Sequence, residues 1–445
     1  MDSTLPGSDL APDSSDLWFL PLGGCGEIGM NLNLFGHDGQ WLMVDCGVTF
    51  EDDKIAMADP QFIESRRDAL VGIIVTHIHQ DHIGALPDLW ERLKAPIYTT
   101  RFTAKVLDRA FAERGLWDVP IIVVETGDCL EIGAFDITWL PITHSTAETH
   151  ALKITTCAGS VLHTADWKID ETPVVGIPFE HKTFAELEGI DAIVCDSTNA
   201  TTPGVSVSEA VLYEGLYDCI AQANGRVVVS CFASNIARLQ TLAEIASVTD
   251  RYIAIMGRSM RQLSEAAKAC GYLNDRFNPT DPDHLGYLPR EEVMAIASGN
   301  QGDGGSALYR LALDTHPDLN LEAGDLVVLS AKTIPGNEEK VDRLVELFEQ
   351  RDIRVILGDN SNAPLHATGH PQQGELADMY GLVKPQLAIP VHGESVHMQA
   401  NADIARACGV PDQLVGVNGD LFVIAGSQAP CIRTGAVEAG RLYRR

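Results

Sequence analysis

Three histidines and an aspartate lie within six consecutive positions of this sequence, and their types and spacing are those of metal ligands. The stretch reads His77-Ile78-His79-Gln80-Asp81-His82. Imidazole nitrogens combined with carboxylate oxygens favour zinc, with manganese as the alternative where carboxylate and water ligands dominate. Scattered core or surface histidines would explain one such residue but not the group. The sequence lacks zinc-finger spacing, which argues against a purely structural ion.

A buried strand must deliver these ligands. The apolar run Val71–Val75 ends just before the histidines, so they are predicted to lie at the carboxyl end of a strand. Apolar residues then recur at helical spacing from Ile83 to Leu93, which predicts one helix opened by Asp81 and His82. The free backbone amides at a helix start stabilise a carboxylate.

Further predicted strands also end in ligand-type residues. Asp166 is placed to bridge two ions with one oxygen to each. Asp45 either supports a ligand from behind or caps the turn at Gly47. The residues at these strand ends are Asp45, His144, Asp166, Asp196 and His392. They extend the candidate ligand set beyond the first stretch.

Composition indicates a globular protein with room for two domains. The chain has 445 residues, of which 45% are hydrophobic and 21% charged. No apolar run reaches the roughly 20 residues needed to cross a bilayer. Residues 1–16 are acidic and rich in Ser and Pro, which predicts a disordered tail rather than a signal peptide. Ten dispersed cysteines without paired spacing indicate reduced thiols and a cytoplasmic protein.

The formal net charge of −30 argues against a protein that coats nucleic acid through a basic face. A phosphate-bearing substrate would have to be held inside a cleft, by metal ions, helix amides and a few arginines. From about Val205 to Leu365, strands alternate with helices, which predicts an inserted α/β domain with a parallel sheet. A capping box formed by Ser206 and Glu209 is expected to start its first helix.

With these pieces in place, the chain from Leu20 onward resembles the β-CASP branch of the metallo-β-lactamase superfamily and, within it, the ribonuclease J family. The resemblance implies an αββα fold interrupted by the β-CASP insertion, and hydrolysis of RNA phosphodiesters. The implied domains are 17–204 and 366–445 for the metallo-β-lactamase fold and 205–365 for the β-CASP domain. The matching stretches are Leu22–Asn31, His77–Pro87, Thr143–Ser145, His163–Asp166, Asp196–Ala200, Phe232–Asn235, Gly257–Met260, Ile334–Glu338, His366–His370 and His392.

The resemblance also implies a role for each candidate residue. One of two divalent metal ions would be held by His77, His79 and His144, and the other by Asp81, His82 and His392, with Asp166 bridging them. The ions would activate a shared water, Asp81 would orient it, and His370 would stabilise or protonate the departing 3′ oxygen. Asp196 falls on the family's acidic position beside the ligands. The residues that fall on RNA phosphate contacts are Ser234, Asn235, His366, Ala367, Thr368, Gly369 and His370.

The implied partner is single-stranded RNA with a 5′-monophosphate, degraded from the 5′ end, with endonuclease activity left open. No membrane association is expected. Three features depart from the family. Glu148 stands in the loop after His144, and Gly304 replaces a usual proline in the loop that begins at Gly299. The sequence also ends at Arg445, where a C-terminal domain that supports dimerisation is usual, so a homodimer stays open. The alternatives are a dimetal hydrolase of a small ester or thioester, a DNA-processing β-CASP nuclease, and a non-catalytic binding protein.

Overall fold

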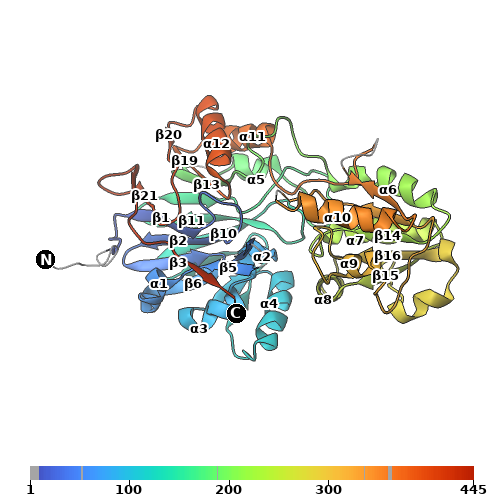
Figure 1. Ribbon diagram of the computed structural model, residues 1–445. Coiled ribbons are helices and arrows are strands. Elements are labelled where there is room, and N and C mark those ends of the chain that lie inside the picture. Colours follow the sequence, from blue (N-terminus) through green and yellow to red (C-terminus); the bar gives the residue numbers. More distant parts are fainter. Residues whose placement is uncertain (1–9, 52–53, 188, 335, 359–362, 445) are drawn as a thin grey trace.

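The computed structural model describes residues 10–51, 54–187, 189–334, 336–358 and 363–444. Two large β-sheets lie face to face in one half of the molecule, which we call the sandwich domain (Figure 1). The eight-stranded sheet has the order β22 (Cys431–Arg433), β21 (Leu421–Ala425), β1 (Leu17–Gly23), β2 (Leu32–His37), β3 (Gln40–Val44), β6 (Leu70–Ile74), β7 (Ile97–Thr99), β8 (Ile121–Val123). The seven-stranded sheet has the order β20 (Asp412–Gln413), β19 (Leu387–Val391), β13 (Ala192–Asp196), β12 (Ser160–His163), β11 (His150–Thr155), β10 (Phe135–Pro141), β9 (Cys129–Ile132).

Side-chain alternation along the strands builds three apolar layers. On β3, Leu42 and Val44 point between the two sheets, whereas Trp41 and Met43 point outward to the helices. The helices of the sandwich domain are α1 (Gln61–Glu64), η1 (Arg67–Ala69), α2 (Gln80–Ile83), α3 (Leu86–Leu93) and α4 (Arg101–Glu113), then α5 (His181–Ala185), α11 (Gln373–Val383) and α12 (Ser395–Ala407). A three-stranded sheet joins β4 (Val48–Glu51), β5 (Lys54–Ala58) and β23 (Arg441–Tyr443).

The other half is built around a five-stranded, wholly parallel sheet, and we call it the parallel-sheet domain. Its three central strands are continuous apolar runs buried on both faces, as a helix-covered parallel sheet requires. The strand order is β15 (Tyr252–Met256), β16 (Val293–Ala297), β14 (Val227–Ser230), β17 (Leu326–Leu329), β18 (Arg354–Leu357). The helices are η2 (Glu209–Val211), α6 (Leu212–Ala221), α7 (Ile236–Val248), α8 (Arg258–Ala269), η3 (Pro282–Tyr287), η4 (Arg290–Glu292), α9 (Ala307–Ala312) and α10 (Glu338–Glu349).

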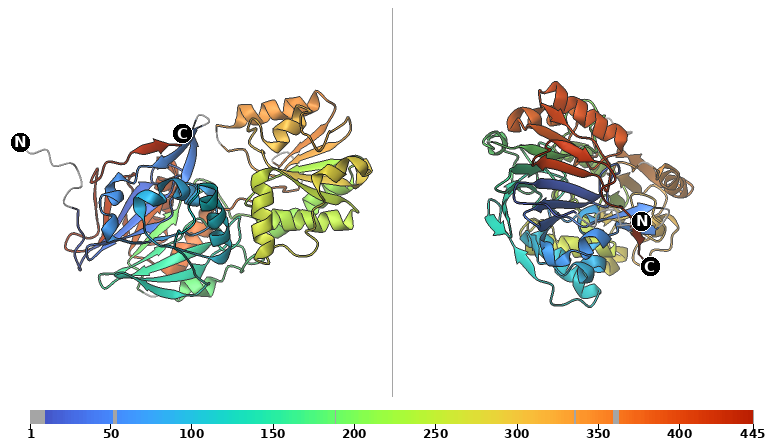
Figure 2. Two further views of the ribbon diagram at one scale, coloured as in Figure 1. Left: turned by 90° about the horizontal axis from the view of Figure 1, so that it is seen from below. Right: turned by 90° about the vertical axis from the view of Figure 1, so that its left-hand side faces the viewer.

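The predicted α/β class, with a parallel-sheet unit inserted into a two-sheet fold, is confirmed. Both large sheets contain strands from before and after the parallel-sheet domain, and the two halves lie side by side in Figure 1 and in the left view of Figure 2. Each helix among the described residues falls short of the length and apolar character that crossing a bilayer requires.

Two local predictions differ from the structure. The helix expected from Asp81 to Leu93 is two helices, α2 and α3, because the chain turns at Gly84 and Ala85 before α3 begins with Pro87 in its first turn. Ser206 and Glu209 form no capping box: the Ser206 hydroxyl donates to Glu375, and Ser208 caps the short helix η2 instead.

The predicted disordered tail, residues 1–16, is described only from residue 10. Residues 1–9 lie outside the described residues. The remaining part contacts the turn between β2 and β3, where the amides of Asp38 and Gly39 donate to the carbonyls of Asp13 and Pro12 at 3.1 and 2.6 Å. The Asp16 carbonyl also lies 2.6 Å from Nδ1 of His37. This part of the chain therefore packs against the eight-stranded sheet.

Candidate metal centre

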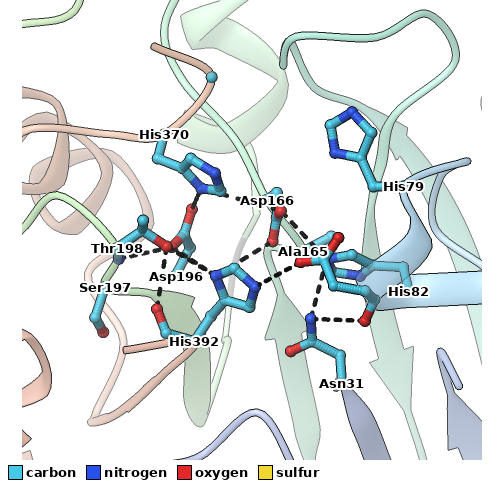
Figure 3. A network of polar contacts seen from close by, with 12 residues as sticks. Asn31, His79, His82, Ala165, Asp166, Asp196, Ser197, Thr198, His370 and His392 are labelled. Atoms are coloured by element: carbon cyan, nitrogen blue, oxygen red, sulfur yellow. Dashed lines mark hydrogen bonds and ion pairs between the residues drawn. The ribbon is translucent and has the colours of Figure 1, made fainter. Parts of the chain in front are cut away.

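Most of the candidate residues come from strand ends that meet at one edge of the sandwich. Strands β3 and β6 run parallel in one sheet, and β12, β13 and β19 run parallel in the other, so their carboxyl ends lie at common edges. The structure brings together all of the predicted metal ligands and the two predicted catalytic neighbours, part of which is shown in Figure 3. These residues are His77, His79, Asp81, His82, His144, Asp166, Asp196, His370 and His392.

A first cluster joins three imidazoles to one carboxylate. Nε2 of His144 lies 3.1 Å from Nδ1 of His79 and 3.7 Å from Oδ2 of Asp166. Nε2 of His77 lies 3.7 Å from the same carboxylate oxygen. Tetrahedral zinc with bonds of about 2.0–2.1 Å separates neighbouring ligand atoms by about 3.3 Å. The spacing therefore suits one four-coordinate ion.

A second cluster shares Asp166 with the first. Nε2 of His82 lies 3.2 Å from Oδ2 of Asp166 and 3.5 Å from Oδ2 of Asp81. Nε2 of His392 lies 3.2 Å from Oδ2 of Asp81. Two imidazoles and two carboxylates thus surround a second position, and the bridging place predicted for Asp166 lies between the two clusters.

The donor set fits bound cations better than it fits a protein interior. Nε2 of His77 is completely buried and has no hydrogen-bond partner among the described residues. A buried polar atom left unpaired costs roughly 1–3 kcal/mol. Several imidazole nitrogens and carboxylate oxygens also converge within 4.8 Å of one another. Both observations are those expected of two neighbouring sites for divalent metal ions.

For two of the histidines, hydrogen bonds on the side of the ring away from the clusters fix which ring nitrogen is free. Nδ1 of His82 donates to Oδ2 of Asp45 at 2.7 Å, and Nδ1 of His144 donates to the carbonyl of Gly369 at 2.6 Å. Each ring therefore presents Nε2 to the clusters, as second-layer support of a metal ligand requires. Of the two readings of Asp45 from the sequence, support of a ligand is the one that the structure shows.

Threonines support two further ligands, and sequence reasoning did not assign them. The Thr198 hydroxyl donates its one proton to Asp196 at 2.7 Å, so it accepts from Nδ1 of His392, also at 2.7 Å. Thr76 likewise donates to Asp45 at 2.8 Å and lies 3.0 Å from Nδ1 of His77. Thr76 directly precedes His77, and Thr198 lies two residues after Asp196 at the end of β13; this position is the signal that could have identified them.

Asn31 is the other residue that sequence reasoning missed. Its Nδ2 lies 3.1 Å from both Nε2 of His82 and the carbonyl of Asp81, so it contacts both ligands that open helix α2 (Figure 3). The residue follows the glycine-rich turn after β1. That turn matched the family, but nothing in its local pattern indicates which strand it faces.

Electrostatics divide the imidazoles into two groups. Burial lowers the pKa of His79 to about 4 and holds the pKa values of His77 and His144 well below the ordinary range, so these three are neutral lone-pair donors at neutral pH. Burial also acts on His82 and His392, but the nearby carboxylates, Asp166 foremost, outweigh it and raise both pKa values well above the ordinary value. Metal binding at the second cluster must therefore displace protons.

Asp196 and His370 form a hydrogen-bonded pair beside the second cluster. Nδ1 of His370 lies 2.7 Å from Oδ2 of Asp196 and 4.0 Å from Oδ2 of Asp166 (Figure 3). Burial lowers the pKa of His370, but these two carboxylates outweigh it and raise the pKa above its ordinary value. The imidazole is therefore a proton donor that still faces partly outward, with 21% of its side chain exposed.

The segment from His366 to His370 passes directly over the first cluster. A Cβ on Gly369 would lie 2.6 Å from the His144 ring, so only glycine allows this approach. Thr368 accepts a hydrogen bond from Asn199 at 2.8 Å, Ala367 is buried, and burial, reinforced by Arg238, lowers the pKa of His366 to about 4.

The side chain of Asn235 is committed to protein contacts. Its Oδ1 accepts from the amide of Arg238 at 2.9 Å, which caps helix α7, and its Nδ2 donates to Glu209 at 3.0 Å. Ser234, immediately before it, remains partly exposed. A phosphate contact at this place would therefore come from Ser234 or from backbone amides rather than from the Asn235 side chain.

Family models match three parts of the chain. Residues 30–178 match the metallo-beta-lactamase superfamily, residues 224–348 match the beta-CASP domain of ribonuclease J, and residues 363–410 match the Zn-dependent metallo-hydrolase RNA specificity domain. These ranges contain every ligand of the two clusters. They also divide the chain as the sheets do, because the five-stranded sheet lies almost wholly within the second match.

Whole-chain comparisons agree with these matches. Ribonuclease J of Sinorhizobium meliloti is 39% identical over 98% of this chain and 78% of its own length, and that of Mycolicibacterium smegmatis is 36% identical over 98% and 79%. Ribonuclease J of Helicobacter pylori is 34% identical, and this chain spans 62% of its length. A crystal structure of a protein of unknown function from Enterococcus faecalis matches 92% of this chain with a TM-score of 0.65 at 15% identity, which supports the fold alone.

Proposed function

As this chain belongs to the ribonuclease J family and is a metal-dependent ribonuclease, we propose that it degrades single-stranded RNA from the 5′ end and favours a 5′-monophosphate, with endonucleolytic cleavage as a secondary activity. One observation carries the proposal. Two ligand clusters that share Asp166 lie beside the His370–Asp196 pair, and His370 ends the segment 366–370, which passes over the first cluster. A phosphodiester lying across the clusters would thus meet His370 and that segment.

Each side chain takes a separate part in the proposed hydrolysis. When bound, a pair of divalent ions supplies a water of lowered pKa and neutralises the charge that grows on the phosphate. Asp81 is the most exposed of the clustered carboxylates, with 29% of its side chain accessible, and would orient that water. His370, held protonated by Asp196, would donate its proton to the departing 3′ oxygen.

Selection of the 5′ end would follow from a compact phosphate pocket. The start of helix α7 presents backbone amides beside Ser234, and amides at a helix N-terminus bind phosphate. The segment from His366 to Gly369 would form the other wall. Its histidine is neutral at neutral pH, so it would act as a hydrogen-bonding group rather than as a fixed charge. Such a pocket would accept a terminal monophosphate more readily than a triphosphate.

The metal, the compartment and the oligomeric state belong to the same proposal. The nitrogen-rich first cluster favours zinc, and zinc would also suit the second cluster, where manganese is the alternative. All ten cysteines are free thiols, which supports a reducing compartment such as the cytoplasm. A homodimer is proposed as well, and light scattering on purified protein at several concentrations tests it.

The decisive experiment compares defined substrates. Zinc-loaded protein is incubated with end-labelled RNAs that bear a 5′-monophosphate or a 5′-triphosphate. Parallel reactions contain a labelled circular RNA, which has no end, and single-stranded DNA of the same sequence. The proposal expects fastest loss of the 5′-monophosphate RNA, with mononucleotides released from the 5′ end. Rapid cleavage of circular RNA without any 5′ preference would instead make it an endonuclease, and preferential cleavage of DNA would make it a DNA-processing nuclease.

Two variants test the site assignment in the same assay. His79→Ala and Asp81→Ala each remove one ligand from a different cluster, so both should abolish turnover while the fold is kept. Far-ultraviolet circular dichroism checks the fold. Full activity of either folded variant would remove the assignment of that cluster.

A further inference from the structure

Glu148 lies in the loop that carries His144, and the chain adopts an unusual conformation there. Its φ is +58°, in the left-handed region that residues other than glycine seldom adopt. The Glu148 carbonyl accepts a hydrogen bond from Nδ1 of His150 at 2.9 Å, and Nε2 of that ring lies 2.8 Å from the Thr126 hydroxyl. The loop is thus fixed at its base, four residues after a metal ligand.

The carboxylate of Glu148 makes two hydrogen bonds in two different domains. Oε2 accepts from the backbone amide of Phe102 at 2.7 Å, in the first turn of helix α4 in the sandwich domain. The Thr100 side chain does not cap this helix, so Glu148 supplies the negative charge that a helix start favours. Oε1 accepts from the hydroxyl of Tyr272 in the parallel-sheet domain at 2.6 Å.

Tyr272 is itself firmly held. It follows helix α8, where its amide donates to the carbonyl of Ala267 at 3.0 Å, and the next residue, Leu273, is buried in the apolar core. Its ring centroid lies 5.8 Å from that of Phe102, a buried residue in the first turn of α4. A movement of the parallel-sheet domain relative to the sandwich domain would therefore strain this hydrogen bond directly.

The other polar side-chain contacts between α4 and α8 are exposed. Arg258 lies 2.7 Å from Glu113 with 76% and 45% of the two side chains accessible, and Arg109 lies 3.2 Å from Glu265 with 47% and 60% accessible. Ion pairs of this kind contribute little because water screens them. The hydrogen bond from Tyr272 to Glu148 is partly buried and charge-assisted, so it is the stronger contact of the set.

These contacts lie away from the places where the chain passes between the domains. The two linking segments cross at the upper side of the junction in Figure 1, and α4 and α8 approach each other at the lower side. The upper side is fixed by contacts between the sandwich domain and the linking segment: Nζ of Lys168 donates to the carbonyl of Val207 at 3.0 Å, and the Ser206 hydroxyl donates to Glu375 at 2.7 Å. At the lower side, the two domains are joined by the partly buried hydrogen bond from Tyr272 to Glu148.

We propose that Glu148 is a positioning residue: through Tyr272 it sets the spacing of the two domains, and hence the width of the space in which RNA lies over the metal centre. The inference rests on the proposed function only for its consequence on RNA. The residue touches neither the ligand atoms nor His370. Loss of the Glu148 carboxylate would weaken the binding of a long RNA. It would not change the rate of cleavage of a substrate short enough to be held by the sandwich domain alone.

The experiment combines one measurement without RNA and one with it. Tyr272→Phe removes a single hydroxyl and keeps the ring contact with Phe102. Glu113→Gln is the matched control, because it removes an exposed ion pair between the same two helices. Hydrogen exchange of the metal-loaded protein without RNA should become about tenfold faster in Tyr272→Phe for the segment 270–274 and for the start of α4, because one charge-assisted hydrogen bond is lost.

The kinetic measurement separates the binding of RNA from the cleavage step. In Tyr272→Phe, KM for a long 5′-monophosphate RNA should rise about three- to tenfold, as loss of one such hydrogen bond predicts, while kcat for a dinucleotide stays within about twofold. Glu148→Ala should show the same pattern, and Glu148→Gln, which keeps an acceptor for Phe102 and a donor for Tyr272, should restore most of the wild-type behaviour. Glu113→Gln should change neither quantity.

Three results would overturn the inference. They are unchanged exchange and KM in Tyr272→Phe, an equal effect in Glu113→Gln, and a fall in dinucleotide kcat as large as the rise in KM. Absence of RNA cleavage by the wild-type protein would defeat the proposed function instead. In that case hydrogen exchange still decides whether Glu148 sets the domain spacing.

Discussion

Replacing Asp45 by asparagine should weaken metal binding at the second cluster although Asp45 touches no metal. The carboxylate accepts three hydrogen bonds, from Nδ1 of His82 at 2.7 Å, from the Thr76 hydroxyl at 2.8 Å and from the Thr76 amide at 2.9 Å. In Asp45→Asn the Oδ1 atom still accepts from the amide, but an NH₂ group replaces Oδ2 and faces two donors. His82 must then change its tautomer or lose its support.

The size of the effect follows from what such support contributes. Removal of a residue that orients a ligand typically costs 10- to 100-fold in metal affinity, which is about 1.4–2.7 kcal/mol. The upper part of this range is expected for Asp45, because the side chain is completely buried and two of its three hydrogen bonds are lost together. The first cluster should lose less affinity, since Asp45 reaches its imidazoles only through Thr76, which lies beside Nδ1 of His77.

The assay is a metal titration with a matched control. Protein is equilibrated against graded concentrations of a chelator, and zinc per chain is measured by mass spectrometry. Asp325→Asn serves as the control: Asp325 is equally buried and accepts from the amide of Arg226 and from Arg290, but it lies in the parallel-sheet domain. Unchanged affinity for both metals in Asp45→Asn, or an equal loss in Asp325→Asn, would refute the reasoning.

Three further predictions concern the same centre and its surroundings. Burial lowers the pKa of His370, but Asp196 and Asp166 outweigh it and raise the pKa, so the imidazole stays protonated to higher pH and kcat should fall as pH rises through that pKa. Asp196→Asn should move this alkaline limb of the pH–rate profile to lower pH. An unmoved limb would count against His370 as the acid. Arg238→Ala leaves Glu209 buried and unpaired, so chemical denaturation should show a loss of about 3–5 kcal/mol, and a loss below about 1 kcal/mol would contradict a buried ion pair. Removing the metals with a chelator should lower the melting temperature reversibly, because ligand at a thousandfold excess over Kd stabilises the folded state by about 4 kcal/mol; a melting temperature unaffected by chelation would contradict sites built into the folded state.

Much of the metal centre could be predicted because its residues follow strands. Strand ends are visible in a sequence as the place where an apolar run stops, and parallel strands of one sheet end at the same edge. His77 and His392 follow strands of different sheets, so their placement in one centre was predicted by the resemblance to the β-CASP family rather than by strand order. The support from Thr198 could not be foreseen in the same way, because it depends on which ring nitrogen of His392 turns toward β13, and a sequence carries no record of ring orientation.

The two incorrect local predictions have different physical origins. The Ser206–Glu209 pair has the spacing of a capping box, but the buried carboxylate of Glu375 takes the Ser206 hydroxyl and Arg238 takes Glu209. Both competing partners lie far away along the chain. The helix from Asp81 was predicted as continuous from its apolar spacing alone, although Gly84 and Pro87 mark the break between α2 and α3.

The number and position of bound metal ions test the central claim most directly. Crystals of zinc-loaded protein should show two anomalous peaks at the zinc edge, one among His77, His79 and His144 and one among Asp81, His82 and His392, with Asp166 touching both. Metal analysis of the same protein should give two zinc ions per chain. A single peak at full occupancy, or two peaks without a shared Asp166, would contradict the account.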